Sequence, residues 1–248
     1  MNDKPALDWA DPVTLGLAMF AVFYVVTIIL ALLAFRLFVV LPNRVTNARV
    51  STPGSEKEPL RKMPVSLLVV LGSGGHSKEM LTMLRGLDPQ RYHPIVFVRA
   101  VSDTRSEGML KTTFASLTTS SSSDSNFLIK PSAILTVPRA RSVGQSWFTT
   151  PFTTLQATVA SLMLVAKQQP DVILCNGPGT CLPICLAGYV LRFWGLKHVK
   201  VIFVESFCRV QSLSLTGRLL YRVADRFIVQ WQGLKGRYPQ AEYLGQLC

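Results

Sequence analysis

The stretch from Val65 to Glu79 reads VSLLVVLGSGGHSKE, and its pattern predicts a fold class. Its first half, up to Leu71, is a nearly continuous apolar run, which is typical of a strand buried on both faces of a sheet. A glycine-rich turn follows, and from about Ser77 apolar residues recur at helical spacing until Pro89 ends the helix. A buried strand, a glycine turn and a helix in this order indicate a parallel sheet flanked by helices.

The same alternation continues toward the C-terminus. Within residues 65–248 we expect further strands over 95–98, 134–137, 172–175, 199–204 and 227–230, and helices from 150 and over 180–194 and 216–224. The apolar face of the helix that begins at Thr150 is expected to contain Leu155, Val159, Leu162 and Ala166. The sequence therefore predicts an α/β class with one doubly wound, Rossmann-like parallel sheet.

The N-terminal part predicts a membrane-spanning helix over residues 12–35. These 24 residues contain no charge, and at about 1.5 Å per residue they extend about 36 Å, more than the ~30 Å hydrocarbon core of a bilayer. A buried core helix and a cleaved signal peptide are the alternatives, and the three aspartates before the apolar run argue against a signal peptide. Arg36, Arg44 and Arg49 follow the run, so the positive-inside rule predicts that residues 1–11 are luminal and the rest cytosolic.

Two segments differ in composition from the expected elements. Residues 36–64 combine prolines with mostly basic charges, which indicates a juxtamembrane linker. Residues 116–125 read SLTTSSSSDS and indicate a flexible surface insertion between the second and third strands. The net charge of +12 favours an anionic partner. Because no aromatic-rich nucleic-acid signature accompanies the basic residues, anionic lipid or a pyrophosphate is favoured over nucleic acid.

The five cysteines form no CxxC pair and are odd in number, which predicts free thiols in a reducing compartment. Cys181 and Cys185 stand one helical turn apart. The three histidines are scattered, so we interpret these cysteines as small buried hydrophobes rather than as metal ligands. No metal and no cofactor is expected.

Three loops are candidate sites for chemistry, because ligands of open parallel sheets bind outside the carboxyl ends of the strands. The first loop consists of Gly72, Ser73, Gly74, Gly75 and His76. Its bare backbone amides could hold a phosphate at the start of the following helix. A dinucleotide fingerprint is excluded because Ser77 replaces the third glycine, and a P-loop is excluded because no Gly-Lys-Ser/Thr triplet follows.

His76 stands at the expected helix start, where the positive end of the helix dipole disfavours the charged imidazolium. It is therefore a candidate general base, and a capping histidine is the alternative. Glu79, three residues later, is interpreted as a residue that favours the helix N-terminus.

The second loop contains the candidate acceptor- or phosphate-binding residues Asn176, Gly177, Gly179 and Thr180. Its glycines would let a ligand approach the backbone, and a tight structural turn is the alternative. The third loop begins with Glu205, directly after the strand over 199–204. Glu205 is a second candidate catalytic residue, for a sugar hydroxyl or as a base, and an ordinary loop charge is the alternative.

Four segments in order carry a family resemblance: LGSGGHSKEM, CNGPGT, VESFCRVQSLSLTG and ADRFIVQW, which begin at Leu71, Cys175, Val204 and Ala224. Together they resemble the family of membrane-anchor subunits of the split dolichol-pathway N-acetylglucosaminyltransferase. That family is similar to the bacterial transferase that completes lipid II. The resemblance implies that residues 65–248 are the N-terminal, acceptor-side half of a two-domain GT-B fold. Cys208 departs from the small residue expected there, a conservative change.

The resemblance also implies a function and partners. It predicts a heterodimer with a small cytosolic catalytic subunit, which carries most of the UDP-GlcNAc site, and a chain inactive alone. The complex would add the second GlcNAc to GlcNAc-pyrophosphate-dolichol in N-glycan precursor synthesis, at the endoplasmic reticulum membrane and the nuclear envelope. A self-sufficient membrane-tethered nucleotide-dependent enzyme and a purely structural anchor are the alternatives.

A GT-B enzyme has two domains that face each other across a cleft, and this chain has room for one. The missing half must therefore be recruited. We expect the apolar C-terminal residues Tyr243, Leu244 and Leu247 to bind the partner subunit, because in a single-chain relative this junction would be covalent. A frayed terminus is the alternative.

Overall fold

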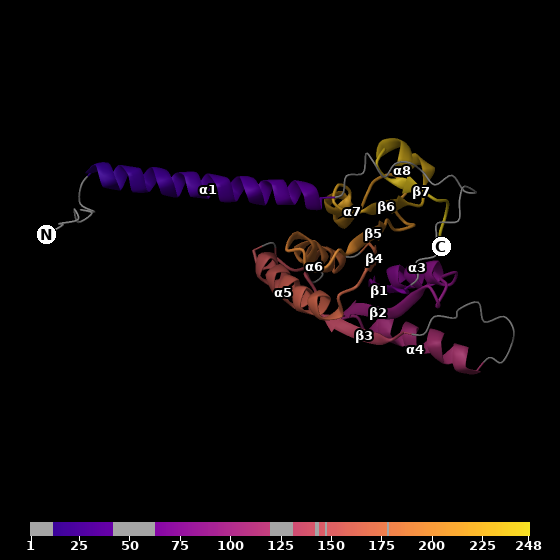
Figure 1. Cartoon of the computed structure of the whole chain (residues 1–248). Helices are drawn as coiled ribbons and strands as arrows, with labels where there is room; N and C mark the ends of the chain where they lie inside the picture. Colours follow the sequence, from indigo (N-terminus) through magenta and orange to yellow (C-terminus); the bar gives the residue numbers. More distant parts are fainter. Residues whose placement is uncertain (1–11, 42–62, 120–130, 142–143, 147, 178) are drawn as a thin grey trace. The chain divides into compact units, whose positions relative to one another are not determined.

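The computed structural model of the protein describes residues 12–41, 63–119, 131–141, 144–146, 148–177 and 179–248 (Figure 1). The chain divides into two compact units, residues 1–41 and 42–248, which are described separately. The predicted luminal segment 1–11, most of the predicted linker, and the second part of the serine-rich segment lie outside the described residues.

The first unit contains one helix, α1 (Pro12–Val40), in its described part. The helix has 29 residues and is long and apolar enough to cross a membrane. It continues five residues past the predicted end at 35, because Leu37 and the three apolar residues after it extend the helix beyond Arg36. Arg36 therefore lies inside the helix, about one turn from its end.

The second unit is an α/β domain built on a seven-stranded sheet in which every pair of neighbours is parallel. The strands are β1 (Val65–Val70), β2 (Tyr92–Ala100), β3 (Ala133–Val137), β4 (Val172–Asn176), β5 (Lys200–Val204), β6 (Arg226–Val229) and β7 (Glu242–Tyr243). Their order, β3-β2-β1-β4-β5-β6-β7, reverses direction between β1 and β4. The predicted doubly wound parallel sheet is confirmed, and such a reversal is where ligands bind in folds of this class.

Helices cover both faces of the sheet (Figure 1). They are α3 (Gly75–Leu84), α4 (Thr104–Thr119), α5 (Thr150–Gln168), α6 (Cys181–Phe193), α7 (Leu215–Leu220) and α8 (Gln232–Arg237). Residues of β1 alternate between two hydrophobic clusters. Leu67 and Val69 pack with α3 and α4, whereas Leu68 and Val70 pack with α5 and α6. The predicted burial on both faces is therefore confirmed for β1, whereas the edge strand β3 leaves Ile134 and Thr136 exposed.

Helix α4 corrects the expectation for the connection between β2 and β3. The predicted insertion begins at residue 116, but α4 continues to Thr119. The carboxylate of Asp103 accepts a hydrogen bond from the Ser106 amide at 3.1 Å, which satisfies a free donor of the first turn. Leu110 on the same helix is fully buried, so α4 is anchored by a cap and by the core.

Helix α5 corrects the predicted apolar face. Leu155 and Val159 are 63% and 48% exposed, Ala166 is also exposed, and only Leu162 packs against the core. The buried residues of α5 are Ala157, Ser161 and Val165. Small side chains at these positions let α5 lie close against α6, and this packing outweighs the larger apolar area of the predicted face. The exposed apolar face of α5, defined here by Phe152, Leu155, Val159 and Met163, is left uncovered in the described residues.

Helix α6 is deeply buried. Eight of its thirteen residues, among them Cys181 and Cys185, are in the core. The Sγ atoms of Cys175 and Cys185 lie 3.5 Å apart, and burial raises the pKa of the Cys175 thiol well above its ordinary value. The interpretation of Cys181 and Cys185 as small buried hydrophobes is confirmed.

Candidate functional site

The three predicted loops meet at the carboxyl ends of β1, β4 and β5. Hydrogen bonds connect one side chain from each loop with a fourth side chain, that of Glu79 on α3. Nδ1 of His76 lies 2.9 Å from Oδ1 of Asn176. The amide nitrogen of Asn176 donates to Oε2 of Glu79 at 2.9 Å, and the hydroxyl of Ser206 donates to Oε1 of Glu79 at 2.9 Å. We call these four residues the site network.

His76 is the second residue of α3, and its side chain is 33% exposed. Gly74 precedes the helix with φ of 65°, in the region where glycine is favoured. The glycine loop is held in place from α4, because the Ser106 hydroxyl donates to the carbonyl of Gly72 at 2.8 Å. The Ser77 hydroxyl also contacts this carbonyl. His76 therefore projects from a fixed helix start.

Gly177 makes room for the imidazole. A β-carbon at this position would overlap with the ring and lie 2.7 Å from Nδ1 of His76. The residue also has φ of 76°, so a side chain would strain the backbone as well. The first and second loops therefore fit together only with glycine at this position.

Asn176 is fully buried at the end of β4, and both ends of its side-chain amide have partners. Glu79, whose side chain is 14% exposed, joins the loop after β4 to the loop after β5. Sequence reasoning missed this role and gave Glu79 only a helix-terminal preference. The available signal was its spacing, because residues three apart on a helix share a face and His76 stands three residues before it.

Glu205 is fully buried, and its carboxylate binds the loop that follows β5. Oε2 accepts from the amide and the hydroxyl of Ser214 at 3.0 and 3.2 Å, and Oε1 accepts from the amide of Ser206 at 3.1 Å. Burial raises the pKa of Glu205, and the hydrogen bonds from Ser214 and Ser206 counteract part of that rise. A β-carbon at Gly217 would overlap with this carboxylate. These contacts favour a loop-positioning role, and a catalytic role for Glu205 stays a prediction.

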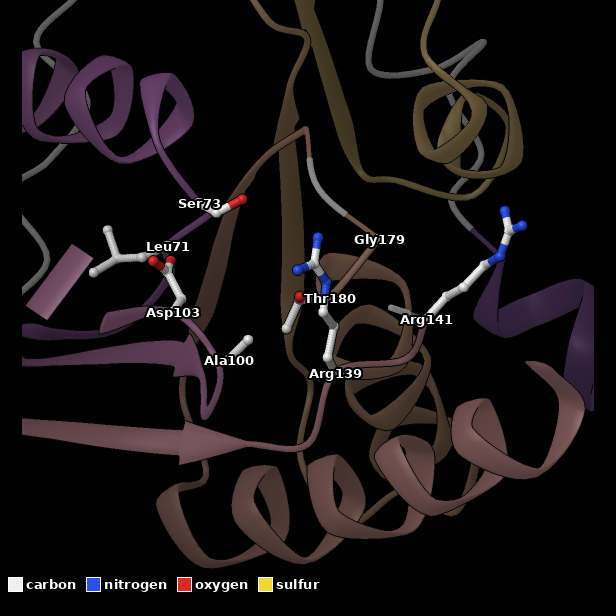
Figure 2. Close-up of a pocket in the computed structure, with 8 residues that line it drawn as sticks. All are labelled: Leu71, Ser73, Ala100, Asp103, Arg139, Arg141, Gly179 and Thr180. Atoms are coloured by element: carbon white, nitrogen blue, oxygen red, sulfur yellow. The ribbon is translucent and has the colours of Figure 1, made fainter. Parts of the chain in front are cut away.

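A cationic pocket of about 70 Å³ lies beside the glycine loop (Figure 2). It is lined by Leu71, Ser73, Ala100, Asp103, Arg139, Arg141, Gly179 and Thr180. Figure 2 shows Arg139 extending toward Thr180, while Arg141 extends in another direction. Of the predicted phosphate-binding residues, Ser73, Gly179 and Thr180 are thus brought together. Sequence reasoning missed both arginines, although their position directly after β3 was a signal.

The chain resembles known proteins in its sequence and in its fold. The profile of the family described as "Oligosaccharide biosynthesis protein Alg14 like" matches residues 67–247. The chain belongs to the Alg14 family. It is 46% identical over 200 residues to the UDP-N-acetylglucosamine transferase subunit alg14 of Schizosaccharomyces pombe, covering 79% of this chain and 89% of that protein. It is 43% identical over 183 residues to the human UDP-N-acetylglucosamine transferase subunit ALG14, covering 74% and 83%.

Among solved structures, the fold is similar to MurG of Acinetobacter baumannii, with a TM-score of 0.48 and 18% identity. The match covers 68% of this chain and 43% of MurG, so the Alg14-family chain spans less than half the length of that protein.

The C-terminal tail of this Alg14-family chain is bonded to the sheet. Gln230, at the end of β6, accepts from the amide of Leu247 at 3.1 Å and donates to the carbonyl of Glu205 at 3.0 Å. Tyr243 and Leu244 are 40% and 54% exposed. The tail is thus linked to the base of the third loop through Gln230 while Tyr243 and Leu244 face solvent, and partner binding by Tyr243, Leu244 and Leu247 stays a prediction.

Within the described residues, no group of three or more His, Cys, Asp or Glu side chains is placed to hold a metal ion.

Proposed function

We propose that this chain is the membrane-anchoring, acceptor-binding subunit of a heteromeric transferase that adds the second GlcNAc to GlcNAc-pyrophosphate-dolichol. The observation that carries the proposal is the Alg14-family match over residues 67–247, together with relatives named as UDP-N-acetylglucosamine transferase subunits. The domain would be the acceptor-side half of a GT-B enzyme. A small cytosolic subunit would supply the other half and most of the UDP-GlcNAc site, and the chain alone would be inactive.

The cationic pocket supports a diphosphate-bearing acceptor. Guanidinium groups bind phosphate oxygens through paired hydrogen bonds, and Arg139 and Arg141 both line the pocket. The hydroxyls of Thr153 and Thr154, in the first turn of α5, donate to the carbonyl of Ala140 at 2.8 and 3.2 Å. The pocket therefore adjoins the helix that carries the exposed apolar face. A cationic pocket next to an apolar surface suits a ligand with a charged head and a hydrocarbon tail.

His76 is the proposed general base. The acceptor hydroxyl oxygen would form a bond to the anomeric carbon of the donor GlcNAc, the bond from that carbon to UDP would break, and UDP would leave with the electron pair. The hydroxyl proton would pass to His76. Its position at the start of α3 places the imidazole at the carboxyl ends of the strands, where ligands of such sheets bind.

The membrane arrangement completes the proposal. Helix α1 would cross the endoplasmic reticulum membrane once, with the α/β domain in the cytosol. Protease added to sealed microsomes should then digest the chain beyond about residue 45, as the positive-inside rule predicts. Full protection of the domain would overturn this orientation.

The test is reconstitution. The full chain is expressed with candidate soluble subunits, purified in detergent, and assayed for transfer from labelled UDP-GlcNAc to a synthetic GlcNAc-pyrophosphate-polyprenol. We expect transfer by the complex and none by either subunit alone. Transfer by this chain alone would favour a self-sufficient enzyme, and a complex without transfer would overturn the proposal.

A further inference from the structure

We propose that Glu79 is a positioning residue that, through Asn176, fixes the tautomer of His76 so that Nε2 is the proton-accepting atom of the site. The inference rests on the proposed function, because it concerns the base of that reaction. It follows from the direction in which each hydrogen bond of the site network must run.

The direction of each hydrogen bond can be derived from the carboxylate of Glu79 onward. An ionised carboxylate only accepts hydrogen bonds, so the group of Asn176 that faces Oε2 of Glu79 at 2.9 Å must be its NH₂. The other end of the same amide is then its oxygen, which also only accepts. Because this oxygen lies 2.9 Å from Nδ1 of His76, Nδ1 must carry a hydrogen. A neutral imidazole has one ring hydrogen, so Nε2 is left with the lone pair.

Glu79 itself is held from a second direction. The Ser206 hydroxyl donates to Oε1 at 2.9 Å, and the Cys208 amide lies 3.3 Å from the Ser206 oxygen and donates to it. The carboxylate is therefore anchored by loops that follow two different strands, β4 and β5. Such an orienting partner is what a ring needs to keep one tautomer and one direction.

The same carboxylate would stabilise the product of proton transfer. Oε2 of Glu79 lies 4.0 Å from Nδ1 of His76, the distance of an ion pair once the imidazole is protonated. The Cys248 thiol faces the network from the tail. Burial, with a smaller contribution from the charge of Glu79, raises its pKa, so it is neutral near pH 7 and adds no charge. Lys78 on α3 and Glu205 and Arg209 in the third loop are the other charged residues of these segments. The carboxylate of Glu205 is turned toward Ser206 and Ser214, and the charge of Arg209 acts on Glu205.

The decisive variant is Glu79→Gln. The glutamine can keep both hydrogen bonds, with its oxygen toward Asn176 and its NH₂ toward the Ser206 oxygen, but it lacks the charge. We expect kcat to fall about tenfold or more. The reason is that the protonated imidazole loses the negative charge beside it. A group that merely ties the loops together predicts an unchanged kcat, because this variant can keep both hydrogen bonds.

The matched control is Glu107→Gln on α4. Glu107 pairs with Arg99 and Lys111 and has no contact with the site network. This variant should leave kcat unchanged.

A second measurement identifies the tautomer directly in the wild-type complex. The ¹⁵N shifts of the histidines in the labelled wild-type complex distinguish the two tautomers, and the chain has only three histidines. We expect His76 to carry its hydrogen on Nδ1, and Asn176→Ala to give a mixture of tautomers. A hydrogen on Nε2 in the wild type would overturn the inference, and an unchanged kcat in Glu79→Gln would overturn the stabilisation of the protonated imidazole by the charge of Glu79. Absence of transfer by the wild-type complex would instead overturn the proposed function.

Discussion

The imidazole of His76 fills the space that a side chain at Gly177 would need, with Nδ1 2.7 Å from the position of a β-carbon there. The two residues lie in different loops, about a hundred positions apart in the sequence. Correct placement of the histidine is therefore a property of the β4 loop as much as of α3.

Gly177→Ala should displace His76 and reduce transfer while leaving the complex assembled. The backbone at φ of 76° adds a strain of about 1–2 kcal/mol for a residue with a side chain. Turnover and the melting temperature of the purified complex measure the two effects. Gly108→Ala, in open space on α4, is the control and should change neither. Normal turnover in Gly177→Ala would show that the ring position is not required.

His76→Ala should lower the turnover number about 10²- to 10⁴-fold, the usual cost of removing a general base. Assembly should be unaffected, because the side chain is partly exposed and packs on a glycine. Co-purification of the partner is measured beside the rate. His198→Ala, at an exposed position, serves as the control. A normal rate with an intact complex would favour the alternative, in which His76 only caps the helix.

Arg139→Ala should raise KM for the lipid-linked acceptor and leave KM for UDP-GlcNAc unchanged, because the cationic pocket lies on the acceptor side of the proposed enzyme. Arg139→Lys should recover only part of the affinity, since an ammonium cannot make the paired hydrogen bonds of a guanidinium. Initial rates at varied acceptor concentration test this, with the exposed Arg105→Ala as control. An increase in the donor KM alone would contradict the assignment of the pocket.

Deletion of residues from Tyr243 onward should release the soluble partner while this subunit stays folded in the membrane. The truncation removes the exposed Tyr243 and Leu244 but keeps the buried Ala241. Fractionation of microsomes, with blotting of the partner, measures the release. Removal of Cys248 alone should retain the partner, because it deletes only one contact with Gln230. Wild-type retention in the longer truncation would place the docking site elsewhere.

The stability of the domain should depend on the ionisation of Glu205. Burial raises its pKa above the ordinary value of 4.5, so the folded state favours the protonated acid more than the unfolded state does. The stabilisation is complete below the ordinary pKa and is lost as pH rises through the raised pKa. We expect the wild type to lose stability relative to Glu205→Gln as pH rises from the ordinary value of 4.5 through the raised pKa, measured by denaturant unfolding. Parallel curves for the two proteins would contradict the raised pKa.

The order of strands and helices, and the loops that bear the site, could be predicted because they depend on local patterns. The apolar run at Val65 and the glycines after it indicate a strand and a turn without reference to any residue distant in the sequence. The buried face of α5 could not be predicted in this way. Which face of α5 is buried depends on how closely Ala157 and Ser161 let α6 approach. A count of apolar residues favours the face with the larger Leu155 and Val159, which is in fact exposed.

The role of Glu79 in the site could not be predicted from local sequence patterns either. Its two hydrogen-bond partners, Asn176 and Ser206, lie 97 and 127 residues away in the sequence. A local reading finds an acidic residue in the first turns of a helix, which is common and needs no other explanation. Only the order of the strands brings β4 beside β1 and β5 beside β4, which gives this carboxylate its neighbours.

The position of the site within the sheet also affects how the protein responds to heat. Its loops follow β1, β4 and β5, which are inner strands, and Leu68, Ile173 and Phe203 in these strands are fully buried. Amide hydrogens in such strands exchange with solvent mainly when the whole domain opens. His76, Asn176 and Ser206 lie at or shortly after the ends of these strands, so we expect the site network to unfold together with the sheet. Loss of transfer on heating should then coincide with the unfolding of the domain.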